Sequence, residues 1–403
     1  MKKIGILTFH NSVNNGAVMQ AYSLSRKLQE CFPACKVEII DYHMPKVVEA
    51  YRHNVWKDIL CKNPVLLAKR LVRLCQQPGR LRKLNRRSAV FAACRDRLPL
   101  SDFSLLSDDT QELFEHINKT YDILVVGSDA VWNYTLRGFP NAYFPDSTVT
   151  CTKMSCAASC YGMEFLNISQ QVRQVIGKTL EDFSFLGVRD SATEDFVRWS
   201  GCRRETAHVC DPTMFLNVEA LPVDRAKLEE KLKKKGFDFN RPTIGMMGSS
   251  KILKLIRRMY GAKYQIAALY EPTAGADVDL YDLTPYEWAY VFRYFKVTFT
   301  TFFHGTLLSL RNGVPVICTA LQSEFAKNHI PKTLDVLQRL GYEDWYFETD
   351  YLQQNVDAIR HTADRFLSTD LKAEILQRVE QEAQTFEVFR SALEGIMEEK
   401  NNG

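Results

Sequence analysis

The chain has 403 residues, of which 46% are hydrophobic and 25% are charged, and its formal net charge is +4. This length is enough for two or three ordinary domains, and the composition is that of a globular protein rather than a disordered one. The net charge is too small to indicate nucleic acid, so we expect no nucleic-acid partner.

The first residues predict neither an export signal nor a membrane segment. In "MKKIGILTFHNS", too few apolar residues follow the two lysines for a signal peptide, and no stretch of the chain approaches the roughly 18 apolar residues of a membrane span. We therefore expect a cytoplasmic protein whose 11 cysteines are thiols. No Cys/His group has metal-ligand spacing, so no metal site is predicted.

The first half of the chain alternates between predicted strands and helices. A short apolar run at 4–8, a polar loop, an amphipathic stretch at 18–28 and the run "KVEIID" at 36–41 together predict a βαβ unit. Similar apolar runs recur further along the chain, at 122–127, 153–159, 185–188 and 207–210. A parallel sheet with helices on both faces is the simplest arrangement of these elements.

After a highly charged stretch at 223–242, the alternation resumes. Strands are predicted at 243–247, 264–270, 296–303 and 314–320. Thr284 is followed by Pro285 and, three residues on, by Glu287, which predicts a helix that begins with a capping box. We predict an α/β chain of two Rossmann-like domains with parallel sheets facing a central cleft. Residues 1–220 form the first, acceptor-side domain, with a basic helical insertion at about 55–100, and residues 221–403 form the second, with a helical tail.

His304 is the first candidate catalytic residue. It follows the predicted strand 296–303, and Gly305 and Thr306 open the predicted next helix. Ligands of open α/β sheets bind where strands end and helices begin, since the free N–H groups there suit a phosphate or carboxylate. A histidine at this place can move a proton near neutral pH, and a glycine admits the ligand to the backbone. The alternative is a helix-capping or core histidine.

Another predicted strand end carries polar residues. The run 122–127 is followed by Ser128 and Asp129, then by Trp132 and Asn133. Asp129 can accept hydrogen bonds from a sugar or act as a base, and Trp132 offers an apolar face to a sugar ring. The alternative is an aspartate that caps a helix, with the tryptophan packed behind it.

Two further loops are candidate binding segments. Arg189 ends the predicted strand 185–188 and can hold a carboxylate or phosphate with two N–H groups, unless it forms a structural pair with Asp190. Asn15 and Gly16 lie in the first strand-to-helix loop, where either a small ligand or a plain turn fits.

A basic segment at 69–97 carries ten Lys/Arg and a single acid. A solvated basic helix is one interpretation. The other is contact with an anionic membrane surface or with an acceptor that bears a diphosphate.

Taken in order, several of these segments resemble the polysaccharide pyruvyl transferase family over roughly residues 1–320. The resemblance is carried by "IGILTFHNSVNNGAVMQAYSLSRKL", "YDILVVGSDAVWN", "FLGVRDSATEDF", "HVCDPTMF" and "TPYEWAYVFRYFKVTFTTFFHGTLLSLRNGVPVIC". It implies a GT-B-like fold and a transferase that moves pyruvate from phosphoenolpyruvate (PEP) onto two hydroxyls of a sugar as a cyclic ketal. PEP is then a co-substrate, and no other cofactor is needed.

The resemblance also implies roles for particular residues. His304 matches the family's catalytic histidine, and Arg189 matches an arginine that holds PEP. Many members have arginine where this chain has Phe302, so a PEP-binding cation is either missing or supplied elsewhere, with Lys251 and Arg311 as the candidate replacements. The expected acceptor is a sugar of a surface polysaccharide, such as a capsule or exopolysaccharide, carried on a lipid diphosphate at the inner face of the membrane. The alternatives are a nucleotide-sugar glycosyltransferase and an inactive sugar-binding relative.

Overall fold

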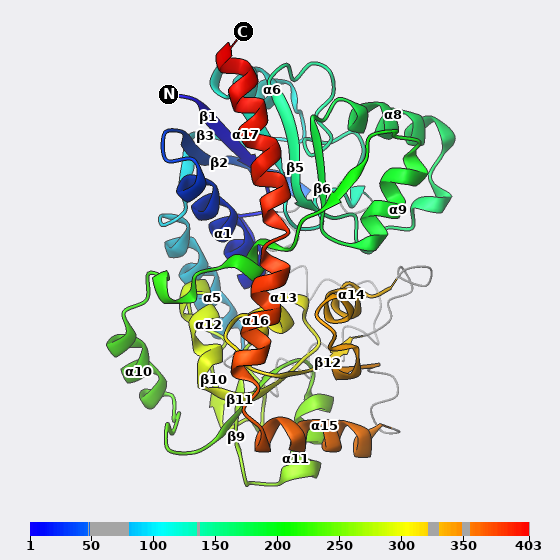
Figure 1. The fold of residues 1–403 in the computed structure, drawn as a ribbon. Coiled ribbons are helices and arrows are strands. Elements are labelled where there is room, and N and C mark those ends of the chain that lie inside the picture. Colours follow the sequence, from blue (N-terminus) through cyan, green and yellow to red (C-terminus); the bar gives the residue numbers. More distant parts are fainter. Residues whose placement is uncertain (47, 49–79, 135–137, 321–329, 349–354, 403) are drawn as a thin grey trace, which may run out of the picture.

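The computed structural model describes residues 1–46, 48, 80–134, 138–320, 330–348 and 355–402. Within them the chain forms two parallel β-sheets, each covered by helices, which confirms the predicted α/β class (Figure 1). The first sheet, of seven strands, lies within residues 3–208, and the second, of six, lies within residues 243–348. Residue 220, the predicted boundary between the two domains, therefore lies between the two sheets in the sequence.

The first sheet has the strand order β3-β2-β1-β4-β5-β6-β7. Its strands are β1 (Lys3–Leu7), β2 (Lys36–His43), β3 (Leu100–Leu106), β4 (Ile123–Val126), β5 (Thr152–Ala158), β6 (Phe185–Val188) and β7 (Thr206–His208). The helices described between these strands are α1 (Asn15–Cys31), α5 (Arg80–Arg95), α6 (Gln111–Thr120), α8 (Gln170–Glu181) and α9 (Ser191–Ser200). Edge strand β3 alternates between partly exposed and exposed residues from Asp102 on, and for this reason it lacks the apolar run by which the other strands of this sheet were predicted.

The second sheet has the order β10-β9-β8-β11-β12-β13. Its strands are β8 (Thr243–Met247), β9 (Gln265–Ala268), β10 (Val278–Asp279), β11 (Phe295–Thr300), β12 (Val316–Ala320) and β13 (Tyr346–Glu348). The helices of this half are α10 (Arg225–Lys234), α11 (Ser250–Tyr260), α12 (Pro285–Val291), α13 (Phe303–Arg311), α14 (Lys332–Arg339), α15 (Val356–Ser368), α16 (Lys372–Ala383) and α17 (Phe386–Asn402).

The predicted capping box is present, but the predicted start of α13 is wrong by two residues. Thr284 accepts a hydrogen bond from the Glu287 N–H, while the Glu287 carboxylate accepts one from the Thr284 N–H. Strand β11 ends at Thr300 instead of residue 303, and α13 begins at Phe303, so His304 lies in the first helical turn. The helix ends before Gly313, where φ is +70° and glycine is favoured.

The last helix returns to the first sheet. Helix α17 runs beside the first domain, whereas α16 lies on the second (Figure 1). Phe386, Phe389 and Leu393 of α17 are fully buried in the cluster that contains Ile4 and Leu28. The tail assigned to the second domain therefore needs correction, because its final helix completes the core of the first.

Candidate functional site

The candidate site is organised around Arg189, a buried arginine at the carboxyl end of β6. Its side chain is 3% exposed, and its Nη1 lies 2.7 Å from Oδ2 of Asp211. Two other carboxylates stand further from the guanidinium, Asp190 at 3.7 Å and Asp129 at 3.9 Å. Asp190 thus lies near Arg189, as in the alternative of a structural pair, but the closest carboxylate to the guanidinium is that of Asp211.

Local structure fixes the three carboxylates. Asp211 caps the 3₁₀ turn Pro212–Phe215, accepting hydrogen bonds from the Thr213 N–H at 3.0 Å and hydroxyl at 2.6 Å. Asp190 caps α9 in the same manner. Asp129 follows β4 with φ of +73°, a backbone conformation that non-glycine residues rarely adopt, and its carboxylate accepts from the Ala130 N–H at 2.8 Å. No helix begins at Asp129 in the described chain, so the capping alternative is wrong for this residue.

The mutual charges keep these groups ionised. Burial opposes the charge of Asp211, but His304 and Arg189 beside it hold the pKa of its carboxyl well below the ordinary range. The pKa of Asp129 is lowered despite its burial, since Arg189, His304 and Lys332 all favour its anion. Burial disfavours the charge on Arg189, and the surrounding aspartates, Asp211 first, raise the pKa of its guanidinium above the usual value.

Arg189 also has unused hydrogen-bonding capacity. Among the described residues, its Nε and Nη2 are buried and have no acceptor. A buried donor without an acceptor costs free energy, so native proteins seldom leave one unpaired unless a ligand or water fills the place. The two free N–H groups of the guanidinium match the two oxygens of a carboxylate or phosphate.

His304 reaches this cluster from the second domain. Its Nε2 lies 3.7 Å from Oδ2 of Asp211, beyond hydrogen-bond distance, and this buried nitrogen has no hydrogen-bond partner among the described residues. The other face of the imidazole packs on α1 of the first domain. A Cβ at Gly16 would lie 2.0 Å from Nδ1, so only glycine admits the ring here. The neighbouring Asn15 side chain is buried, and its Oδ1 is likewise unpaired. The structure thus brings Gly16 to His304. Asn15 and Gly16 begin α1 and do not lie in the loop before it, which corrects their predicted position.

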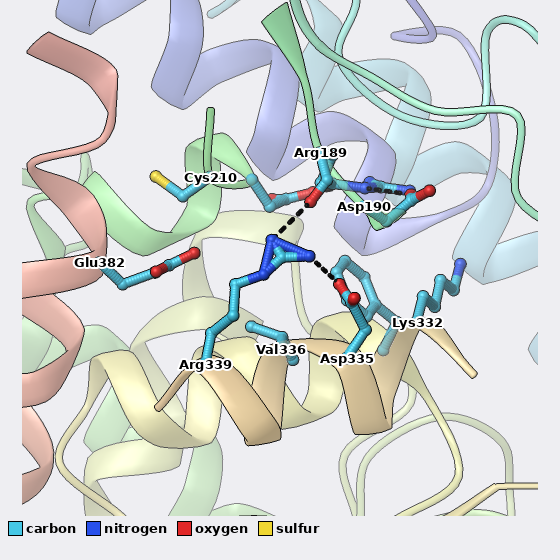
Figure 2. A pocket seen from close by; sticks show the side chains of 10 residues that line it. Arg189, Asp190, Cys210, Lys332, Asp335, Val336, Arg339 and Glu382 are labelled. Carbon is cyan, nitrogen blue, oxygen red and sulfur yellow. Dashed lines mark hydrogen bonds and ion pairs between the residues drawn. The ribbon is translucent and has the colours of Figure 1, made fainter. Parts of the chain in front are cut away.

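Helix α14 closes the other side of a small pocket. Figure 2 shows Lys332, Asp335 and Arg339 rising from this helix toward Arg189 and Asp190. Asp335 accepts a hydrogen bond from the Ser191 hydroxyl at 2.9 Å and pairs with Arg339. The complete lining is Arg189, Asp190, Cys210, Asp211, Phe303, Lys332, Asp335, Val336, Arg339 and Glu382.

Three residues predicted beside Asp129 face the core instead. Trp132 is 0% exposed and donates its indole N–H to the Tyr143 carbonyl at 3.1 Å. It cannot offer a face to a sugar, so the packing alternative is correct for this side chain. Asn133 is buried and donates to the Tyr161 carbonyl, and the buried Ser128 hydroxyl donates to Gln20. These hydrogen bonds hold in place the loop that follows β4.

The residues after His304 are also structural. A Cβ at Gly305 would lie 2.5 Å from Oγ1 of Thr300, so this glycine is required by packing against β11. Thr306 is 0% exposed, and its hydroxyl lies 3.4 Å from the Phe302 carbonyl. Neither faces the pocket, which corrects their assignment to substrate binding.

The expected replacements for the arginine absent at Phe302 lie elsewhere. Phe302 packs against Tyr270, with ring centroids 4.1 Å apart. Lys251 is exposed in the first turn of α11 and does not line the pocket. Arg311, at the far end of α13 from His304, donates to the Leu216 carbonyl at 2.6 Å and pairs with Glu380 at 3.1 Å. Both suggestions are therefore wrong for this pocket.

A separate polar cluster lies at the carboxyl ends of β1 and β2. Oδ1 of Asp41 is 2.9 Å from Nε2 of His10, 2.9 Å from Nε2 of His43 and 2.7 Å from Nη2 of Arg95. The His10, Asp41 and His43 ligand atoms lie within 4.8 Å of one another, close enough to hold a metal ion. The Arg95 guanidinium already balances the carboxylate at that oxygen, so the residues as arranged do not favour a divalent cation. Sequence spacing does not predict this cluster, because only Asp41 and His43 share an element, β2, whereas His10 follows β1 and Arg95 ends α5.

The basic segment is only partly described, because residues 69–79 lie outside the described chain. Two of its members on α5 are buried: Arg87 contacts the Tyr270 ring and backbone of the second domain, and Phe91 is 5% exposed. Neither can meet a membrane, which corrects the interpretation that included them. Within the described residues, every helix is too short or too polar to cross a bilayer.

Sequence reasoning missed several members of the pocket. Asp211 contributes to the family resemblance only within the segment "HVCDPTMF", although Asp211 directly follows the predicted strand 207–210, much as Asp129 follows the run 122–127. Lys332, Asp335 and Arg339 belong to a segment that was set aside as a helical tail. Nothing local in "PKTLDVLQR" distinguishes them from surface residues.

Comparisons with known proteins agree with the fold and the order of the motifs. The profile of the polysaccharide pyruvyl transferase family matches residues 14–323. No curated protein gives a significant match to the chain. Among solved structures, the UDP-GlcNAc 2-epimerase of Methanocaldococcus jannaschii is similar with a TM-score of 0.53 at 11% identity, covering 92% of this chain and 94% of its own. The UDP-GlcNAc 2-epimerase of Neisseria meningitidis bound to UDP-GlcNAc has a TM-score of 0.53 at 8% identity, with 98% and 99% covered. At these identities the likeness shows the two-domain GT-B architecture alone.

Proposed function

Because the chain belongs to the polysaccharide pyruvyl transferase family, we propose that it transfers pyruvate from PEP onto two hydroxyls of a sugar and releases phosphate. The observation that carries the proposal is the unsatisfied guanidinium of Arg189 in a cluster that also holds His304, since Oδ2 of Asp211 lies 2.7 Å from Nη1 of Arg189 and 3.7 Å from Nε2 of His304. An anion with a planar carboxylate fits the two free N–H groups of Arg189. A histidine near that anion can supply and accept protons.

In the proposed reaction, a proton adds to the methylene carbon of PEP while a sugar hydroxyl oxygen bonds to C2. The C2–O bond to phosphate then breaks, and the second hydroxyl oxygen bonds to C2 and closes the ketal. One hydroxyl proton ends on the methyl group and the other on the released phosphate, so the reaction needs no oxidant. His304 is the residue suited to these transfers, since its Nε2 has no protein partner among the described residues.

Asp129 has a narrower role than that of a general base. Its pKa is lowered, so it is a weak base that stays ionised at neutral pH. We assign it the orientation of an acceptor hydroxyl by hydrogen bonding.

The test is to incubate the protein with PEP and candidate lipid-linked sugars, measuring phosphate release and seeking the pyruvyl mass increment on the sugar. His304→Ala should lower turnover by roughly 10²–10⁴ with the fold intact. Release of UDP or GDP from a nucleotide sugar, without use of PEP, would identify a glycosyltransferase. Saturable sugar binding without turnover would identify an inactive relative. Either result refutes the proposal.

We also propose a lipid-diphosphate-linked acceptor of surface-polysaccharide assembly, approached through the basic segment at the inner face of the membrane. Because Arg87 is buried, the variant to test replaces only Arg80, Arg82 and Arg86 with Gln. Each basic residue near an anionic surface contributes on the order of 1 kcal/mol, so binding to anionic liposomes should fall and the KM for a lipid-linked acceptor should rise. An equal change in KM for a lipid-free acceptor would refute the membrane contact.

A further inference from the structure

Lys332, on α14, has different surroundings from Arg189 and Arg339, the other basic residues that line the pocket. Lys332 is the first residue of this helix, and its Nζ lies 4.9 Å from the ring centroids of both Tyr161 and Phe303. Tyr161 follows β5 in the first domain, and Phe303 begins α13 in the second. The ammonium is therefore held between aromatic rings from both domains, at the edge of the pocket that contains Arg189.

This ammonium has no close anionic partner in the described part of the chain. Arg189 pairs with Asp211 and Arg339 pairs with Asp335, whereas no described carboxylate lies within 4.0 Å of Lys332. The carboxylates of Asp129, Asp190 and Asp211 act on it only from further away. Burial and the nearby Arg189 charge lower the pKa of its ammonium, so the protein groups around Lys332 disfavour this cation. A bound anion would reverse that effect.

Two of the three cations that line the pocket, Arg189 and Lys332, also suit different parts of one ligand. Arg189 presents two free N–H groups in a fixed plane, which fits a carboxylate. Lys332 presents a compact charge with rotatable donors, which fits the tetrahedral oxygens of a phosphate. Resting on the function proposed above, we infer that Lys332 binds the phosphate of PEP while Arg189 binds its carboxylate. Lys332 lies beyond the 14–323 match to the family profile, so this assignment comes from the structure of this chain.

The test separates the two ends of PEP with probes that carry one end each. Dissociation constants of inorganic phosphate and of pyruvate are measured by calorimetry, and KM for PEP by phosphate release, for the wild type, Lys332→Gln and Lys332→Arg. Lys254→Gln, a change of an exposed lysine on α11, is the matched control. A lost charge-assisted contact should weaken phosphate binding and raise KM for PEP by roughly 10- to 100-fold in Lys332→Gln. Pyruvate binding should stay unchanged, and Lys332→Arg should recover most of the loss.

Two results would overturn the assignment: phosphate affinity in Lys332→Gln equal to that of the control, or an equal loss of phosphate and pyruvate affinity. The second would mean that Lys332 supports the pocket as a whole. Failure of the proposed function has a different signature. In that case the wild type transfers no pyruvate from PEP, whereas its phosphate binding still depends on Lys332.

Discussion

Asp211→Asn tests whether the Arg189 cluster is a preformed charged site. The amide keeps an oxygen for the Thr213 hydrogen bonds but turns its NH2 group toward Arg189, so the change removes both the charge and the acceptor at Oδ2. At 2.7 Å, and with an effective dielectric constant near 20, the attraction between Arg189 and Asp211 is about 6 kcal/mol before the cost of burial. Asp190 and Asp129 keep the guanidinium partly compensated, at 3.7 and 3.9 Å. Removing one partner of a buried pair costs about 3–5 kcal/mol, and the two remaining carboxylates place our expectation near the lower value, about 3 kcal/mol.

The assay is equilibrium urea unfolding at neutral pH, with the double variant Arg189→Met/Asp211→Asn completing a cycle. The double variant should lose less than the sum of the two single changes, because both members of the closest pair are removed together. Asp224→Asn is the matched control. Asp224 caps α10 in the same way but pairs with Lys227 on the surface, so Asp224→Asn should destabilise the protein far less than Asp211→Asn does. An Asp211→Asn loss equal to that of the control, or strict additivity in the cycle, would refute the reasoning.

Further predictions concern three other residues. Trp132→Ala should cost about 3–5 kcal/mol in urea unfolding and leave the acceptor KM unchanged, because the ring is fully buried; the opposite pattern would restore the sugar-binding role. Gly16→Ala should lower kcat at least tenfold, since the new methyl group would displace the His304 imidazole. Thermal stability should change little, because α1 otherwise tolerates alanine. An unchanged kcat would contradict this placement of the imidazole. Burial lowers the pKa of His43 to about 4. Between pH 6.5 and 4, this histidine is therefore protonated in the unfolded chain but neutral in the folded one. Stability should therefore fall by about 3 kcal/mol between pH 6.5 and 4, and His43→Gln should remove that part of the slope in acid titrations monitored by circular dichroism.

The sequence predicts the scaffold well because buried parallel strands leave an unbroken apolar run. It also locates His304 and Arg189, since both follow such a run directly. Trp132 follows a strand in the same way but turns into the core. The sequence pattern is identical for a side chain that faces a ligand and for one that packs in the core, so only the tertiary structure distinguishes the two. Lys332 shows the reverse case, because its position depends on Tyr161 and Phe303 from distant segments.

The packing of α17 against the first domain affects how the protein folds during its synthesis on the ribosome. The core around Ile4 and Leu28 is sealed by Phe386, Phe389 and Leu393, which are synthesised more than 350 residues after Ile4. N-terminal domains usually fold first during synthesis, yet here the first domain emerges with an apolar face that stays uncovered until the second domain has been made. The nascent chain must carry that face in water throughout its elongation, so this stage of synthesis is where it would most need a chaperone.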